Sequence, residues 1–441
     1  MTPLQYGLTP KMKPILPKRS AVIAVLDVGT SKIACVIARL KPHPPQEVLR
    51  RRSHAIEVIG FGHTGARGMK AGAVIDLAEA EEAVRHAVDL AERMAQVQIE
   101  SVVVSVSAGR IGSELLAASI NLPGSTVSDQ DVVRVLAAVN QHSLRRGRVI
   151  LHALPIDYRL DDARGIRDPR GMAGRQFGVD MHVVTIDAAV ARNLMLVVES
   201  CHLSVEAMAA GAYAAGLAAL ADDEADLGAA LVDMGAGTTA IAVFSGGRFI
   251  HADGFAVGGN HVTMDLARGL NATLYDAERI KTIYGSVLGG GLDERDMITV
   301  PPVGADDREP PQFVSRAALT RIIRPRVEEI LEMVRDRLAA SPFAAESKAR
   351  VILTGGASQL TGLPELASRI LGRPLRIARP LGVAGLPEAA KGPAFAVAAG
   401  LLVYPQTAHL EHFERRHTTH HLLPGTGGYV ARLGRWLRES F

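Results

Sequence analysis

Two short segments of this chain are versions of each other, and this duplication constrains the fold more than any other feature. Residues 22–33 read VIAVLDVGTSKI, and residues 229–241 read AALVDMGAGTTAI. Each has an apolar run, an Asp-x-Gly turn with small hydroxyl residues, and a second apolar run, which predicts strand, tight turn and strand. Glycine leaves backbone N–H groups free to face a phosphate, and the Asp can hold Mg²⁺ through water. A single copy is better explained as an ordinary hairpin, but two predict a duplicated fold that holds one nucleotide between its halves.

A third segment strengthens the nucleotide hypothesis. Residues 350–358, RVILTGGAS, predict a strand running into a Gly-Gly turn, and a helix should follow with Pro364 in its first turn. Paired glycines let backbone approach adenine or the α-phosphate. Glu278 and Lys281 share one face of a predicted helix, where they either hold ribose and adenine or form a solvated ion pair.

Composition excludes several classes of protein. A chain of 441 residues predicts two or more domains. A net charge of +3 and 4% aromatic residues argue against a nucleic-acid partner. Cys35 and Cys201 lie in apolar stretches and are expected to be buried thiols rather than a disulfide.

The two ends of the chain predict peripheral segments. Residues 1–19 carry four prolines and four basic residues and predict a loose basic arm without a signal peptide. No apolar run reaches transmembrane length; the longest, 207–221, predicts a buried helix, so we expect a cytoplasmic protein with at most peripheral membrane contact. Residues 405–427 contain five histidines and predict a flexible linker more readily than a metal-binding tail.

Residues 428–441 predict a short amphipathic helix. Arginines occupy the side opposite a Trp-containing apolar face, which is typical of a helix lying on an anionic membrane surface. The alternative is a terminal helix docked on the protein's own core. The apolar face consists of Tyr429, Val430, Leu433, Trp436, Leu437 and Phe441, and the opposite side carries Arg432, Arg435 and Arg438.

Periodicity also predicts elements between these motifs. A helix is expected over residues 77–94, and Ser128 with Asp131 predicts a capped helix start. Residues 299–313, with four prolines, predict a mobile loop. A long helix should run from Ser315 through residue 338 with a break or kink where Pro325 interrupts the pattern.

The three turns resemble those of the actin-like ATPase superfamily. Residues 66–77 (ARGMKAGAVIDL), residues 165–174 (GIRDPRGMAG) and the C-terminal helix further resemble the FtsA family of bacterial cell-division proteins. This resemblance implies an α/β actin-like ATPase fold: duplicated mixed-sheet domains, an interdomain nucleotide cleft and an FtsA-type inserted subdomain. The implied subdomains are IA (20–100, 182–215 and 383–404), IC (101–181), IIA (216–258 and 340–382) and IIB (259–339).

The resemblance also implies ATP and Mg²⁺ as cofactors. Two phosphate loops, a helix start and an adenosine-facing turn would supply the contacts, with Asp27 and Asp233 holding the metal. The implied nucleotide-binding residues are Asp27, Gly29, Thr30, Ser31, Lys32, Asp233, Gly235, Gly237, Thr238, Thr239, Gly258, Gly259, Asn260, Glu278, Lys281, Gly355, Gly356 and Ala357. Residues 209–214 offer no Glu or Gln to orient an attacking water, so we expect at most a slow ATPase.

The function implied by the family is a scaffold that polymerises on the cytoplasmic face of the inner membrane at the division septum. Its expected partners are the C-terminal peptide of FtsZ, further copies of itself, later divisome proteins and anionic lipid. Within IIB, we expect the FtsZ peptide to contact Arg316, Leu319, Ile323 and Arg324, unless this helix only packs its apolar face inside the subdomain. Alternatives are a PilM-like adaptor of a pilus or secretion apparatus, a sugar-kinase-like enzyme and an MreB-type filament.

Overall fold

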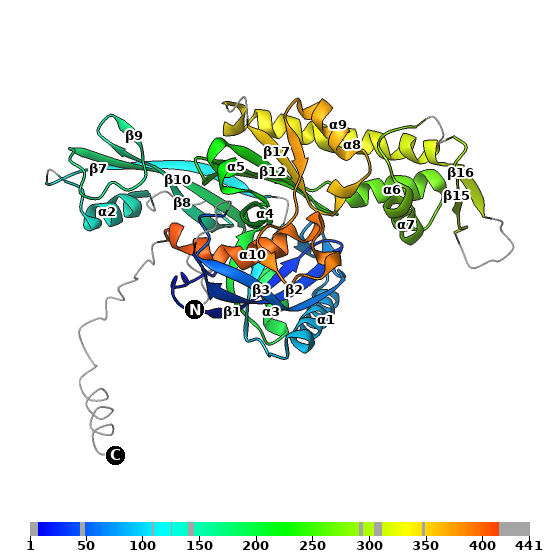
Figure 1. The fold of residues 1–441 in the computed structure, drawn as a ribbon, viewed down its shortest axis with the longest axis horizontal. Helices are drawn as coiled ribbons and strands as arrows, with labels where there is room; N and C mark the ends of the chain where they lie inside the picture. The colour runs from blue at the N-terminus through cyan, green and yellow to red at the C-terminus, as the bar shows by residue number, and fades with distance from the viewer. Residues whose placement is uncertain are drawn as a thin grey trace, which may run out of the picture.

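The computed structural model describes residues 8–44, 49–107, 110–124, 126–139, 145–290, 294–303, 311–345 and 349–413. Two mixed sheets form the centre of the molecule, and further units extend to both sides of them (Figure 1). Apolar runs supply strands that are buried on both faces, as in β1 (Ala21–Val28) and β12 (Ala229–Met234).

The two central sheets repeat one topology, which confirms the duplicated actin-like fold. The first has the order β11-β6-β1-β2-β3-β19, and the second has the order β14-β13-β12-β17-β18. In each, the first strand pairs antiparallel with the next strand of the chain and parallel with a later one. The other strand bounds are β2 Lys32–Pro42, β3 His54–Gly65, β6 Ser101–Val106, β11 Ser204–Ala210, β13 Thr239–Ser245, β14 Arg248–Phe255, β17 Arg350–Thr354, β18 Leu375–Ile377 and β19 Val383–Ala384.

Helices α4 (Gly211–Ala219) and α10 (Ala396–Thr407) pack against each other between the two sheets. A Cβ on Gly400 would lie 1.7 Å from the carbonyl oxygen of Ala214, so the two backbones touch. The expectation of one helix over residues 207–221 is wrong, because its first four residues complete strand β11, which pairs parallel with β6. A run of small apolar residues is compatible with a buried strand and with a buried helix. Hydrogen bonding of its first part to β6 makes that part a strand.

Helices on the outer faces complete the first half. Helix α1 buries the expected apolar face against strands β2 and β3, and its N-cap is Asp76. Cys35 is buried and Cys201 half-buried, and both are free thiols as expected. The remaining elements of both central units are β4 Met69–Lys70, β5 Ala73–Val74, α1 Leu77–Ala95, α3 Ala188–Ser200, α5 Asp222–Leu227 and α9 Leu363–Leu371.

An inserted unit with its own four-stranded sheet and apolar core lies at one end of the molecule (Figure 1). The predicted capping box is confirmed: the Asp131 N–H donates to Ser128 Oγ at 3.3 Å, and the Ser128 N–H donates to Asp131 Oδ2 at 3.0 Å. Residues 101–106, expected in this unit, instead form β6 of the first central sheet. The insert consists of β7 Gly112–Asn121, α2 Asp129–Val139, β8 Arg148–Leu160, β9 Ala163–Ile166 and β10 Gln176–Asp187.

At the opposite end, α6 (Gly259–Leu270), α7 (Leu274–Tyr284) and α8 (Arg316–Ala339) pack together, and a two-stranded sheet lies at their outer end (Figure 1). Strands β15 (Met297–Val300) and β16 (Gln312–Ser315) take both ends of the expected loop 299–313, whose residues 304–310 lie outside the described part. Helix α8 begins after the predicted cap and continues through Pro325, so the expected break is wrong. Burial of one apolar face along both parts of the helix keeps them continuous.

Both ends of the described chain pack more closely than expected. Thr9 is buried, and its N–H donates to the carbonyl of Ile150 at 3.1 Å. Lys11 also bonds to strand β8, and burial lowers the pKa of its ammonium group to about 7.

The first nine residues of the expected linker are also ordered against the body. Glu411 Oε1 lies 2.8 Å from His152 Nδ1, and the His412 N–H donates to Ala153 O at 2.9 Å. The rest of the linker and the amphipathic helix lie outside the described residues. None of the helices in the described part is long and apolar enough to cross a membrane.

Candidate functional site

The two Asp-x-Gly turns have the same backbone geometry. In the first, the Gly29 N–H donates to the carbonyl of Lys32 at 3.0 Å, and in the second the Gly235 N–H donates to the carbonyl of Thr238 at 2.9 Å. Each turn joins a strand to its antiparallel neighbour at the same edge of equivalent sheets. The duplication read from the sequence therefore places two matching loops opposite each other.

The third turn follows β17 and lies beside the second loop. Gly355 has a φ of +85°, and a Cβ there would lie 2.4 Å from both Asp233 Oδ1 and the carbonyl of Met234. Both the backbone conformation and the lack of space therefore require glycine. The helix predicted after this turn is α9, with Pro364 in its first turn as expected.

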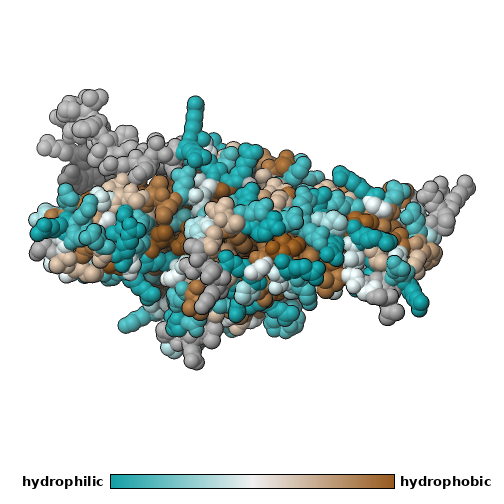
Figure 2. Space-filling model, turned by 90° about the horizontal axis from the view of Figure 1, so that it is seen from above, coloured by the Kyte–Doolittle hydropathy of each residue, from teal (hydrophilic) through white to brown (hydrophobic). Residues whose placement is uncertain are grey.

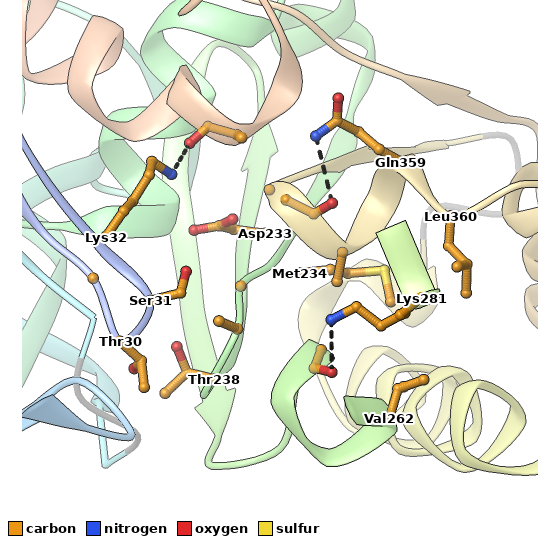
Figure 3. A pocket seen from close by; sticks show the side chains of 18 of the residues that line it. Thr30, Ser31, Lys32, Asp233, Met234, Thr238, Val262, Lys281, Gln359 and Leu360 are labelled. Atoms are coloured by element: carbon orange, nitrogen blue, oxygen red, sulfur yellow. Dashed lines mark hydrogen bonds between the residues drawn. The ribbon is translucent and has the colours of Figure 1, made fainter. Parts of the chain in front are cut away.

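These turns enclose a cavity of about 540 Å³ between the two halves. Figure 3 shows the first loop on one side, Asp233 in the middle, and Lys281 and Gln359 on the far side. The volume and the position between two domains are typical of a small-molecule or cofactor site. Of the expected residues, the cavity wall includes Asp27, Gly29, Thr30, Ser31, Lys32, Asp233, Gly235, Thr238, Gly259, Glu278, Lys281, Gly355, Gly356 and Ala357.

Two carboxylates give the cavity its negative side. Burial raises the pKa of Asp27, while its hydrogen bond from Ser105 Oγ, 2.8 Å long, partly offsets this effect. Burial and then the charge of Asp27 raise the pKa of Asp233 to about 6. Desolvated carboxylates of like charge suit a hard divalent cation, because it would compensate both. Their donor chemistry therefore fits Mg²⁺.

Lys32, the nearby cation, is directed elsewhere. Its ammonium group donates to the carbonyl of Ala394 and lies 4.6 Å from the ring centroid of Phe395 (Figure 3). Both partners belong to the short 3₁₀ segment Pro393–Phe395, which leads into α10. Lys32 nevertheless lines the cavity, and its ammonium group keeps two further N–H donors beside the bond to Ala394.

Glu278 and Lys281 form the ion pair that the sequence offered as one interpretation, and the contact with ribose and adenine stays a prediction. Lys281 Nζ lies 2.6 Å from Glu278 Oε2 and 2.8 Å from Thr263 Oγ1. Both side chains also line the cavity, so the ion pair forms part of its wall.

Four expected residues support the loops without lining the cavity. A Cβ on Gly237 would collide with Thr30, and Thr239 donates to the carbonyl of Val257 at 2.8 Å. Gly258 and Asn260 hold the start of α6 against the second loop; a Cβ on Gly258 would lie 2.5 Å from the carbonyl oxygen of Gly235. Membership of a motif did not by itself predict which residues line the cavity, because alternate residues of a tight turn face away from it.

Sequence reasoning missed much of the cavity wall. Most apolar members come from elements far apart in the chain, and their local patterns match ordinary core positions, but Met234 and Ala236 lie within the second Asp-x-Gly motif itself. Thr282, Gln359 and Thr361 sit just after recognised motifs, and this proximity was the available signal. Ser107 follows β6 and had no such signal. The missed residues are Ser107, Met234, Ala236, Val262, Thr282, Gly285, Val327, Ile330, Gln359, Leu360, Thr361, Leu363, Ala394 and Val397.

The residues expected to bind a partner peptide on α8 require correction. Leu319 and Ile323 are fully buried in the core of the second half, so neither can contact a partner. Arg316 and Arg324 remain on the surface, with Asp296 and Glu328 as ion-pair partners at 3.8 Å and 2.7 Å. The alternative, a helix packing its apolar face inside its own subdomain, is therefore confirmed for those two side chains.

Comparisons with known families agree with this architecture. The family model described as "Cell division protein FtsA" matches residues 230–400, and the model described as "SHS2 domain inserted in FTSA" matches residues 108–185. The second range corresponds to the inserted unit and starts after β6.

Full-length relatives carry the same description. The chain is 53% identical over 436 residues to the cell division protein FtsA of Agrobacterium fabrum, covering 99% of this chain and 98% of that protein. It is 31% identical over 430 residues to the cell division protein FtsA of Escherichia coli K12, covering 95% of this chain and 98% of that protein.

Solved structures confirm the fold at low identity. The PilM-PilN type IV pilus biogenesis complex matches with a TM-score of 0.58 and 18% identity, over 87% of this chain and 98% of the other. MreB5 of Spiroplasma citri bound to ADP matches with a TM-score of 0.52 and 14% identity, over 89% and 98%.

Proposed function

Because this chain belongs to the FtsA family of bacterial cell division proteins, we propose that it binds Mg-ATP between its halves and links FtsZ filaments to the inner membrane. It would polymerise on the cytoplasmic side at the septum and there recruit later divisome proteins. Identity to FtsA over nearly the whole chain favours this over a PilM-like adaptor or a kinase. The 18% likeness to the PilM-PilN complex reflects a shared fold.

The observation that carries nucleotide binding is the pair of matching loops around the cavity, with the buried Asp27 and the half-buried Asp233 between them. Backbone N–H groups of both loops would bind phosphate oxygens, and Lys32 would exchange the carbonyl of Ala394 for a phosphate. Asp27 and Asp233 would hold Mg²⁺ through its waters. The ion would neutralise phosphate charge, while Glu278 and Lys281 would contact the nucleoside.

Hydrolysis should be slow. The junction between β11 and α4 consists of the small apolar residues Ala210, Gly211 and Ala212, and Gly211 lies beside Ser107 of the cavity wall. No side chain in residues 209–214 can orient a water for attack on the γ-phosphate. Bound ATP would therefore persist and serve assembly rather than turnover.

The FtsZ peptide is proposed to bind the unit formed by α6, α7, α8 and the β15–β16 sheet. Because Leu319 and Ile323 are buried, the apolar contacts must come from other side chains. Phe313 is 64% exposed on β16, three residues before Arg316. Brown apolar surface borders teal hydrophilic surface at this end of the molecule (Figure 2). An apolar peptide with acidic residues suits such a combination.

Membrane attachment is proposed for residues 428–441. Six apolar side chains at roughly 1 kcal/mol each and three arginines at about 1 kcal/mol each oppose the cost of ordering the helix. The net free energy of membrane binding should be a few kcal/mol per helix. This is weak for one copy of the protein and strong for a filament that presents many such helices.

The test is sedimentation with anionic vesicles, with and without ATP and FtsZ. The full chain should sediment with the vesicles and bring FtsZ with it. A truncation at Gly425 should bind ATP and FtsZ but leave both proteins in the supernatant. Equal sedimentation of the truncated protein would place the membrane anchor elsewhere.

A further inference from the structure

A second cavity, of about 410 Å³, lies where the insert meets the second half of the molecule. The insert contributes Arg145, Arg148 and the segment before β7, while β14 and the last turn of α8 contribute from the other side. Figure 1 shows this end of α8 approaching the insert. The cavity shares no lining residue with the nucleotide cavity.

Positive charge predominates around this cavity. Four arginines line it against two carboxylates, and each carboxylate already has its own partner. Glu114 Oε1 lies 3.7 Å from Arg145 Nε, and Asp253 Oδ1 accepts a hydrogen bond from Arg337. Among the described residues, Arg110 and Arg148 have no carboxylate in ion-pair contact. The adjoining segments 108–109 and 140–144 contain no Asp or Glu in their sequence.

Arg148 is held in place by neutral groups. Its Nη2 donates to the carbonyl of Thr185 at 2.6 Å and to Thr185 Oγ1 at 3.1 Å, and its Nε donates to the same hydroxyl at 3.3 Å. A Cβ on Gly112 would lie 2.9 Å from Arg148 Nη2, so glycine leaves room for the guanidinium. Burial lowers the pKa of Arg148. Asp187 and Glu114 attract this guanidinium from beyond ion-pair distance and offset part of the effect of burial. A fixed, partly desolvated guanidinium with no carboxylate in ion-pair contact favours an added anion.

We propose that this arginine cleft, defined by Arg110, Arg145, Arg148 and Arg337, binds a phosphate-bearing anion. The guanidinium groups of Arg110 and Arg148, neither of them in an ion pair with a described residue, match the near-dianionic charge of a phosphate monoester. Arg110 can donate two N–H groups to phosphate oxygens, and Arg148, whose Nε and Nη2 bond to Thr185, can donate from Nη1. The cavity leaves space for the group that carries the phosphate. Because its arginines come from both units, the bound anion would hold the insert against the second half. Free phosphate and the phosphomonoester headgroup of phosphatidic acid present this same chemistry.

The experiment measures equilibrium binding of ³²P-labelled inorganic phosphate to the full chain. Saturating Mg-AMPPNP occupies the nucleotide cavity, and chloride keeps the ionic strength constant. We expect one phosphate per chain, with affinity at least tenfold lower in the Arg110→Gln, Arg148→Gln double variant. The matched control is Arg93→Gln, which breaks a surface pair with Asp89 on α1 and should bind phosphate normally.

A second arm identifies the source of the phosphate. Monomeric dihexanoyl phosphatidic acid, a phosphate monoester, should displace the label. Displacement at lipid concentrations far below that of the phosphate indicates a lipid headgroup, and displacement only near the phosphate concentration indicates a free anion. Circular dichroism and AMPPNP affinity check folding, and the exposed single variant Arg110→Gln should itself weaken binding at least threefold. The proposal fails if neither probe binds saturably, or if the arginine variants bind both as the wild type does. This result is independent of whether FtsZ or membranes bind elsewhere.

Discussion

Replacing Asp233 by Asn should stabilise the empty protein, and the gain should depend on pH. The folded-state pKa is raised from its ordinary value of 3.8 to about 6, so ionisation of Asp233 costs stability as the pH rises through this window. The full difference corresponds to at most about 3 kcal/mol. The side chain keeps some exposed surface toward the cavity, so this figure is an upper bound. Between pH 5 and pH 8 the advantage of Asn should grow by about 1.4 kcal/mol.

The assay is urea unfolding of the ligand-free protein at both pH values, followed by far-UV circular dichroism because the single tryptophan lies in the tail. The matched control is Asp89→Asn, on the exposed side of α1, which should show no comparable pH-dependent gain. An equal free energy of unfolding for Asp233→Asn and wild type at pH 8 would refute the idea of an uncompensated carboxylate. A gain that is larger at pH 5 than at pH 8 would have the wrong sign and refute it too.

The same substitution should have the opposite effect when nucleotide is present. Mg-ATP affinity should fall at least tenfold, which is about 1.4 kcal/mol, because half of the proposed metal site is lost. At 100 times the wild-type Kd, the wild type should gain about 2.7 kcal/mol from ligand, and the variant at most about 1.4 kcal/mol. If the variant binds Mg-ATP as tightly as wild type, Asp233 does not hold the metal.

Four further results are expected. Gly355→Ala should cost at least about 2 kcal/mol of stability by thermal melting, since its Cβ would strike Asp233, whereas Gly372→Ala, with a φ of +61° and no atom within 4 Å, should lose only about 1–2 kcal/mol from backbone strain. ATP turnover in a phosphate-release assay should stay below about 1 s⁻¹; a faster rate would reveal a water-orienting group elsewhere. Trp436→Glu should release the protein from anionic vesicles without changing ATP affinity, and co-sedimentation at the wild-type level would exclude the terminal helix as anchor. Charge reversal at Arg316 and Arg324 should weaken binding of the FtsZ peptide in fluorescence anisotropy and spare ATP binding; unchanged peptide affinity would place the site on another surface.

Local sequence predicted those features that depend on a few consecutive residues. The Asp-x-Gly turns, the Gly-Gly turn and the Ser128 and Ser315 caps formed as expected, because their hydrogen bonds join residues three or four positions apart. Because the first turn recurs later in the chain, these local patterns also predicted that the topology is duplicated. The two matching loops were therefore recognisable from the sequence alone.

Burial was less predictable from the sequence. The sequence of the apolar side of α8 is equally compatible with binding a partner and with packing inside its own subdomain. In the structure, Leu319 and Ile323 pack in the core. Similarly, the proline-rich N-terminal segment resembles a free arm, but Thr9 finds hydrogen bonds on β8 in the distant insert. Hydropathy measures the tendency to be buried, and the burying surface comes from residues far along the chain.

The sequence by itself determined the repeated turns, the helix starts and, through its resemblance, the family and the fold class. Only the tertiary structure decided which residues of each turn reach the cavity, which apolar side chains form its wall, and which carboxylates and arginines of the described residues have no ion-pair partner. The reason is physical: turn geometry is set by bonds between near neighbours. The pKa shifts of Asp233 and Arg148 depend on groups that only folding brings close to them.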